Sequence, residues 1–290
     1  MQHTVAPRMP SAPHKALPAN SCDTHAHIFG PFDRYPLKHP AGYDVPDAPV
    51  TRYLQMLDTV GITRGVLVQP APYGTDPTAV LDALAGSRAR LRGIAVGDAS
   101  IHAQELKRWH EGGICGLRFA DMTDATGHTY AGQVSAAVLP DLAPRMQELG
   151  MHAQLWATID NHIRVLPELV KLGMPLVLDH MGMIQTARGL NDPGFVQLLR
   201  HLERGEIYVK LALCRVATSA PEYPELKPFH DAMVAANPER LLWGSDWPYV
   251  RLADKSPDVG ALIDRAFDWI PEAKVRQKVF AENPARLYGF

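Results

Sequence analysis

Two histidines separated by one residue lie near the start of the chain, in the segment N-S-C-D-T-H-A-H-I-F-G (residues 20–30). The segment has the composition of a β-strand, and alternate side chains of a strand share a face, so His25 and His27 should point the same way. His180 and Asp246 each end a short apolar run further along the chain. Imidazoles beside a carboxylate can hold a metal ion or act on a substrate carbonyl. These four residues are the predicted catalytic set.

Two arginines, Arg118 and Arg215, also follow apolar runs. A planar guanidinium binds a carboxylate through paired, charge-assisted hydrogen bonds, so both are predicted to bind an acid group of a substrate. Other polar or aromatic residues at predicted strand ends or in loops complete the expected substrate site: Tyr43, Gln69, Asp76 and Trp156.

The elements that must position these residues alternate regularly along the chain. Short β-branched or apolar runs alternate with segments of helical period, which is the pattern of repeated βα units. The eight predicted strands are 22–27, 65–69, 91–96, 114–119, 152–156, 175–180, 207–213 and 241–246. Eight such units predict a single (β/α)8 TIM barrel over residues 20–290, whose chemistry lies at the carboxyl ends of the strands. Residues 1–19 contain four prolines and are expected to form a disordered tail.

Composition narrows the classes of protein further. The 290 residues are 46% hydrophobic with a formal net charge of -2, and no basic stripe suggests a nucleic-acid partner. No apolar run reaches the roughly 18 residues that a membrane span needs, so a cytoplasmic protein without a membrane partner is expected. Cys22, Cys115 and Cys214 are expected to be reduced thiols. The sequence leaves open whether the protein is a homo-oligomer.

Four motifs together resemble the amidohydrolase superfamily, across about residues 20–290. They are D-T-H-A-H (23–27), L-D-H-M-G (178–182), W-G-S-D-W-P (243–248) and E-N-P-A-R-L-Y-G-F (282–290). The segment V-Q-P-A-P-Y-G-T-D (68–76) is similar to the branch that contains 2-pyrone-4,6-dicarboxylate lactonase and related sugar-lactone and muconolactone hydrolases. The resemblance implies an amidohydrolase-like barrel and a lactonase.

The resemblance also bears on metal binding. Superfamily members commonly hold one or two divalent ions with the histidines of strand one, an anionic residue on strand four, histidines on strands five and six, and the aspartate of strand eight. Arg118 and Trp156 stand at the strand-four and strand-five positions here. Because the pyrone dicarboxylate lactonase works without metal, we expect no cofactor. If one divalent ion such as zinc is bound, the expected ligands are His25, His27, His180 and Asp246.

The expected reaction is hydrolysis of a carboxylate-bearing lactone. Asp246 would activate water, and burial between Trp243 and Trp247 is expected to raise its pKa. The three histidines would donate hydrogen bonds to the lactone carbonyl, while Arg118 and Arg215 orient the acid group. Met183 stands where the family places another arginine, which favours a monocarboxylate lactone or an aldarolactone over the pyrone dicarboxylate.

Three alternatives stay open. One is a metal-independent aldarolactone isomerase, the second a zinc-dependent aromatic-acid decarboxylase of the same superfamily, and the third a barrel that binds an acid without turnover. Two residues near the motifs are also unassigned. Asp23 either orients a histidine or is a buried structural carboxylate, and His152, at the start of the fifth strand, is expected to be structural.

Overall fold

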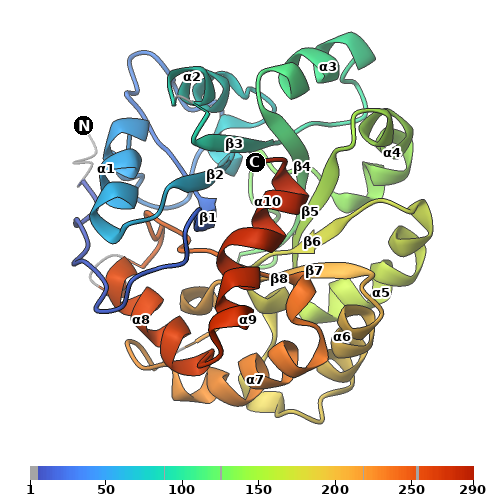
Figure 1. Cartoon of the computed structure of the whole chain (residues 1–290). Helices are drawn as coiled ribbons and strands as arrows, with labels where there is room; N and C mark the ends of the chain where they lie inside the picture. Colours follow the sequence, from blue (N-terminus) through green and yellow to red (C-terminus); the bar gives the residue numbers. More distant parts are fainter. Residues whose placement is uncertain (1–5, 88, 125, 218, 253–254) are drawn as a thin grey trace.

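The computed structural model describes residues 6–87, 89–124, 126–217, 219–252 and 255–290. Eight parallel strands follow one another in sequence order around a barrel (Figure 1). They are β1 Cys22–Ala26, β2 Arg64–Val68, β3 Leu91–Ala95, β4 Ile114–Asp121, β5 His152–Ala157, β6 Leu176–Leu178, β7 Ile207–Leu211 and β8 Leu241–Trp243. The (β/α)8 prediction is confirmed.

The barrel closes between β1 and the segment after β8. The backbone N–H of His27 donates to the carbonyl of Trp247 at 2.8 Å, and the N–H of Asp246 donates to the carbonyl of His25 at 2.8 Å. These two bonds bring the polar end of β1 directly beside the polar end of β8.

Helices surround the barrel, as Figure 1 shows. They are α1 Val50–Val60, α2 Thr78–Gly86, α3 Ala103–Glu111, α4 Leu139–Glu148, α5 Ile159–Leu169, α6 Pro193–Glu203, α7 Lys227–Ala236, α8 Val259–Trp269, α9 Ala273–Gln277 and α10 Asn283–Tyr288. Each of the longer helices buries one apolar face against the strands, as in α5, where Ile159, Leu166 and Leu169 are buried. None of the helices in the described ranges has the length and apolarity that crossing a bilayer requires.

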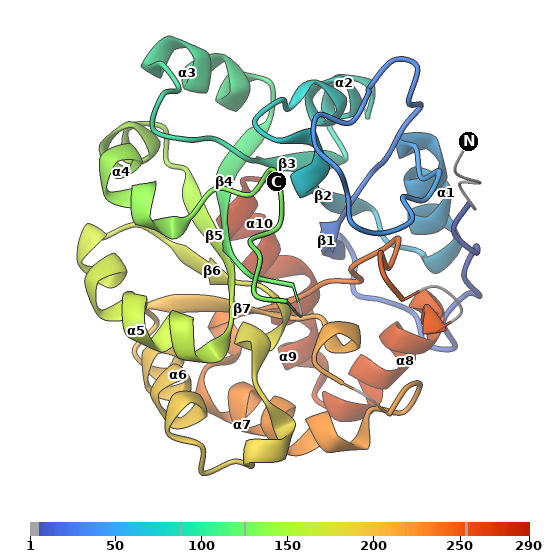
Figure 2. The same cartoon turned by 180° about the vertical axis from the view of Figure 1, so that it is seen from behind.

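The two ends of the barrel are covered differently. At the end where the strands begin, α10 places Tyr288 against His152, with ring centroids 5.2 Å apart. His152 therefore lies in the packing at the opposite end from the polar strand ends. Figure 2 shows the other side of the molecule, where the segment between β4 and α4 crosses the middle of the view.

The N-terminal segment differs from the expectation of a disordered tail. In residues 6–19, the backbone N–H of Ser11 donates to the Asp258 carboxylate at 2.8 Å, and that of His14 donates to the Asp264 carboxylate at 2.8 Å. The segment is held because carboxylates at the start and along α8 accept from its backbone. Residues 1–5 of the predicted tail lie outside the described residues.

All three cysteines are free thiols. Cys22 and Cys214 are buried, whereas Cys115 is partly exposed.

Candidate active site

The four predicted catalytic residues meet at the carboxyl ends of β1, β6 and β8. His25 Nε2 lies 3.4 Å from His27 Nε2, and each of these atoms lies 3.7 Å from Asp246 Oδ1. The His180 ring centroid is 4.7 Å from that of His25. All four side chains are buried. The structure thus brings together residues that are as far as 221 positions apart in the sequence, from His25 to Asp246.

Unusual backbone geometry turns two of these side chains into the site. His180 has a φ of 48° and Asp246 a φ of 62°, both in the left-handed region that non-glycine residues rarely adopt. Such residues persist where the surroundings hold them. Two backbone hydrogen bonds provide that support for Asp246. Its N–H donates to the His25 carbonyl, and its carbonyl accepts from the Tyr249 N–H at 3.0 Å.

The hydrogen bonds of the histidines decide which of their nitrogens can donate. His27 Nδ1 lies 2.7 Å from the Val68 carbonyl, which can only accept, so Nδ1 carries the proton. Burial lowers the pKa of His27 to about 4 and that of His25 to about 3, so both rings are neutral at pH 7. His25 Nδ1 lies 3.2 Å from the Asp179 carboxylate. His27 Nε2 is then a lone pair, and Nε2 of both rings faces Asp246.

This arrangement corrects the expectation that all three histidines donate to a substrate carbonyl. Neutral His27 has no proton on Nε2 to donate, and His25 lies behind His27 rather than on the cavity wall. His180 lines the cavity, and its Nδ1 has no hydrogen-bond partner among the described residues. Burial lowers the pKa of His180 to about 3, so its neutral ring carries one N–H. His180 is the remaining candidate donor.

The negative charge of Asp246 is balanced by side chains that are distant from it in the sequence. Arg215 Nε donates to Asp246 Oδ2, whereas Oδ1 has no hydrogen-bond partner among the described residues. Burial alone would raise the pKa of this carboxyl, but Arg215 and the neighbouring imidazoles hold the pKa well below its usual range. The expectation that burial between Trp243 and Trp247 raises this pKa is therefore wrong.

A buried ionic network supports the histidines from below. Asp179 accepts from Arg118 Nε at 3.1 Å, Arg118 Nη2 lies 3.0 Å from the same carboxylate oxygen, and Gln154 Nε2 donates to it at 3.2 Å. Lys210 Nζ donates to Gln154 Oε1 at 2.7 Å and lies 3.6 Å from Asp179. Burial lowers the pKa of Lys210 to about 8, although Asp179 partly offsets this. Two cations therefore compensate the carboxylate that contacts His25.

Sequence reasoning missed Lys210, Asp179 and Gln154 as parts of the site. The available signal was a lysine within the apolar run I-Y-V-K-L-A-L (207–213), because a charged residue inside a buried strand needs a partner.

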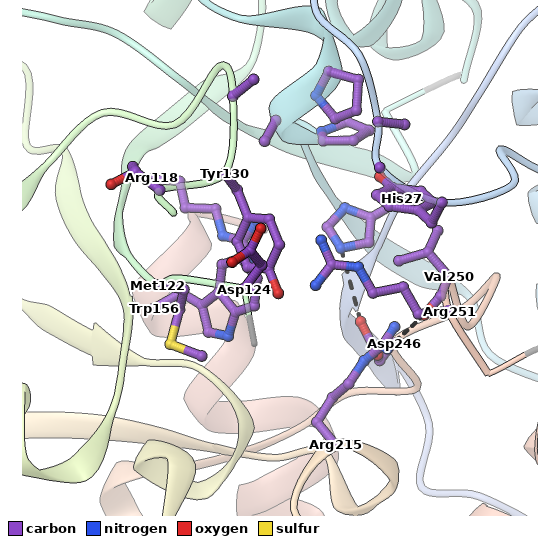
Figure 3. Close-up of a pocket in the computed structure, with 18 of the residues that line it drawn as sticks. His27, Arg118, Met122, Asp124, Tyr130, Trp156, Arg215, Asp246, Val250 and Arg251 are labelled. Carbon is purple, nitrogen blue, oxygen red and sulfur yellow. Dashed lines mark hydrogen bonds and ion pairs between the residues drawn. The ribbon is translucent and has the colours of Figure 1, made fainter. Parts of the chain in front are cut away.

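A cavity of about 410 Å³ opens above these residues (Figure 3). Seven of the predicted site residues line it: His27, Tyr43, Arg118, Trp156, His180, Arg215 and Asp246. The Trp156 ring stacks under the Arg118 guanidinium, with 4.9 Å from the guanidinium carbon to the ring centroid. Met183 also lines the cavity.

Two predicted substrate-binding residues do not line this cavity. Gln69 Nε2 donates to the Gly74 carbonyl at 2.6 Å, and its Oε1 accepts from the Val96 N–H at 3.1 Å, so both ends of the amide bind backbone. Asp76 Oδ1 accepts from the Thr78 N–H at 3.1 Å, next to the start of α2. Both predictions are corrected: these side chains shape the β2–α2 connection.

Asp23 is a structural carboxylate. It accepts from the Ser245 N–H at 2.8 Å, the Ser245 hydroxyl at 2.6 Å, the Tyr53 hydroxyl at 3.1 Å and the His25 N–H at 3.2 Å. Burial raises the pKa of Asp23 to about 6. It thereby ties the turn after β8 to β1 and contacts the backbone of His25, not its ring.

The donor set fits one divalent cation. Ligand atoms of His25, His180 and Asp246 all lie within 4.8 Å of one another, and Nε2 of His25 and Nε2 of His27 each lie 3.7 Å from Asp246 Oδ1. Asp179 and the Val68 carbonyl contact the opposite nitrogens of the two rings, as outer partners of metal-bound histidines do. The guanidinium of Arg118 would by itself repel a nearby cation, but its charge is balanced by Asp179.

A closed parallel barrel that gathers paired imidazoles from its first strand and a carboxylate from its eighth defines a barrel hydrolase of the amidohydrolase type. The family model described as amidohydrolase matches residues 22–290, and the chain belongs to this family.

Relatives of known name cover almost the whole chain. It is 34% identical to a 4-sulfomuconolactone hydrolase of Rhizobium radiobacter, over 98% of this chain and 95% of the relative. It is 32% identical to a 2-pyrone-4,6-dicarboxylate hydrolase of Comamonas testosteroni, over 96% and 93%. A solved structure described as a putative 2-pyrone-4,6-dicarboxylic acid hydrolase from Pseudomonas putida is 29% identical, covers 94% of this chain and 98% of its own, and superposes with a TM-score of 0.78.

Proposed function

We propose that this protein is a hydrolase that opens a lactone bearing an acid group. The two relatives reported above are lactone hydrolases, and the name of each describes a lactone with an acid substituent. The observation that carries the proposal is the unpartnered Oδ1 of Asp246, which faces a cavity lined by three arginines, Arg118, Arg215 and Arg251. A free carboxylate oxygen among cations suits the attack of water on an anionic ester.

The attacking water would lie between Asp246 Oδ1 and His27 Nε2. Both atoms are acceptors, and their separation of 3.7 Å lets one water donate a proton to each. As the water oxygen bonds to the carbonyl carbon, Asp246 takes a proton, and His180 donates to the developing oxyanion. Asp246 then returns the proton to the ring oxygen as the acyl–oxygen bond breaks, which leaves a carboxylic acid and a hydroxyl. The carboxylic acid gives its remaining proton to solvent and becomes a carboxylate.

Asp246 is a weak base in this scheme, because Arg215 and the imidazoles keep its pKa low. A divalent ion held by His25, His27, His180 and Asp246 would acidify a bound water and polarise the carbonyl. Metal independence stays a prediction. Activity that survives dialysis against a chelator would support it, and activity that is lost and then restored by zinc would contradict it.

The proposal is tested by measuring the opening of 2-pyrone-4,6-dicarboxylate, 4-sulfomuconolactone and aldarolactones, with neutral lactones as controls. We expect turnover of at least one acidic lactone by the wild type. D246N should fold normally and lose activity by orders of magnitude. Near wild-type turnover by D246N would refute the assigned role of Asp246, and turnover confined to neutral lactones would refute the substrate class.

A further inference from the structure

Two of the three arginines that line the cavity are engaged by other protein groups. Arg118 makes its two contacts to the buried Asp179 carboxylate, and Arg215 binds Asp246 as well as the Val250 carbonyl, the latter at 2.5 Å. Their charges are therefore compensated by carboxylates that are themselves fully buried. Each of these guanidinium groups therefore gives part of its five N–H donors to the protein and has its charge balanced there.

The third arginine, Arg251, has no carboxylate partner within the part of the chain that the structure describes. No carboxylate of the described residues forms an ion pair with it, and its side chain reaches across the cavity toward Tyr130 in Figure 3. Its guanidinium carbon lies 4.0 Å from the Tyr130 ring centroid and 5.0 Å from that of Tyr43. Of the two carboxylates on the cavity wall, Asp246 pairs with Arg215, and Asp124 Oδ1 accepts from its own loop, at 2.8 Å from the Thr126 N–H.

The aromatic contacts hold Arg251 without using its N–H donors. A guanidinium is attracted to the face of an aromatic ring through its own face, so its edge remains free for an anion. The stack continues from Tyr130 to Trp156, whose ring centroids are 5.9 Å apart with an interplanar angle of 7°. Tyr43 follows β1, Tyr130 follows β4 and Arg251 follows β8, so three loops place this cation.

We propose that Arg251 binds an acid group of the substrate, a carboxylate or a sulfonate, at this cavity. Arg118 and Arg215, in addition to lining the cavity, hold Asp179 and Asp246 in place. The inference rests on the proposed function for the identity of the substrate, but acid binding can be measured without turnover. It adds a third arginine to the two, Arg118 and Arg215, that the sequence predicts to orient the acid group.

The experiment is calorimetric titration with benzene-1,3-dicarboxylate, a rigid diacid that has no lactone bond, and with its neutral diamide. Wild type, R251M and R251K are compared, and R34M is the matched control. Arg34 also stacks on a tyrosine, Tyr35, at 5.0 Å, but it does not line the cavity. The same variants are then assayed for kcat and KM with an acidic lactone.

We expect R251M to bind the diacid at least about ten-fold more weakly than wild type, because a charge-assisted pair is lost. R251K should be intermediate, and R34M should stay within about two-fold. R251M should raise the KM for an acidic lactone more than it lowers kcat. Equal diacid affinity of R251M and wild type, or equal losses in R251M and R34M, would overturn the proposal, as would wild type that fails to bind the diacid.

The experiments can refute the acid-binding role of Arg251 and the proposed lactonase activity independently of each other. Arg251-dependent diacid binding without turnover of any lactone would refute the proposed function and leave the acid site standing. Lactone turnover with an unchanged KM in R251M would refute the acid site and leave the proposed function standing.

Discussion

The buried ammonium of Lys210 should make the stability of the fold depend on pH in a predictable way. Burial lowers the pKa of Lys210 to about 8, whereas an unfolded lysine has a pKa of about 10.4. Below pH 8 the side chain is charged in both states, and keeping that charge buried costs about 3 kcal/mol. As the pH rises past 8, the folded protein loses this proton first, the unfolded chain binds more protons, and stability increases.

The perturbation is K210M, which removes the titrating group. Between pH 7.5 and 9.5 the unfolding free energy of wild type should rise by about 2 kcal/mol relative to that of K210M. Urea unfolding followed by tryptophan fluorescence measures both proteins at each pH. K171M is the control, because Lys171 is exposed and pairs with Glu168 at the surface. Parallel pH dependence of wild type and K210M would refute the account of a buried, charged Lys210.

Two further predictions concern residues that the structure removes from the substrate site. Q69L should lower the unfolding free energy by about 2 to 3 kcal/mol, because the buried Val96 N–H and Gly74 carbonyl lose their partner. KM should stay within about two-fold of wild type. A large rise in KM would instead indicate that Gln69 contacts the substrate. D76A should lower the unfolding free energy by about 1 kcal/mol, because the Thr78 N–H near the start of α2 loses its acceptor. Urea unfolding should show this loss while kcat/KM stays unchanged. Lost activity at unchanged stability would contradict the prediction.

Periodicity and motif spacing were enough to predict the barrel and four side chains that meet at the carboxyl ends of its strands. Alternating apolar runs locate the strands, and the strand-end rule of barrels places His25, His27, His180 and Asp246 together before any coordinates are known. The eight strands were found within a few residues of their observed ends. The difference is largest at β8, which stops at Trp243, and β6 also stops early, at Leu178. There the chain leaves the ladder early and turns His180 and Asp246 into the site through left-handed backbone.

Pairing between distant charges could not be predicted in the same way. Arg118 forms an ion pair with Asp179, and Arg215 forms one with Asp246. In each pair the carboxylate follows a different strand from the arginine. Sequence order does not reveal which loop brings a third arginine to the cavity, and Arg251 is placed by contacts with Tyr43 and Tyr130 from two other loops. The tautomer of His27 likewise follows from one carbonyl on the neighbouring strand.

The most direct test of the central claim is turnover of an acidic lactone in water enriched in oxygen-18, followed by mass spectrometry of the product. Attack of water on the carbonyl carbon predicts one labelled oxygen in the new carboxylate and none in the new hydroxyl. Label in the hydroxyl would contradict acyl–oxygen cleavage. An unlabelled, rearranged lactone would contradict hydrolysis and identify an isomerase.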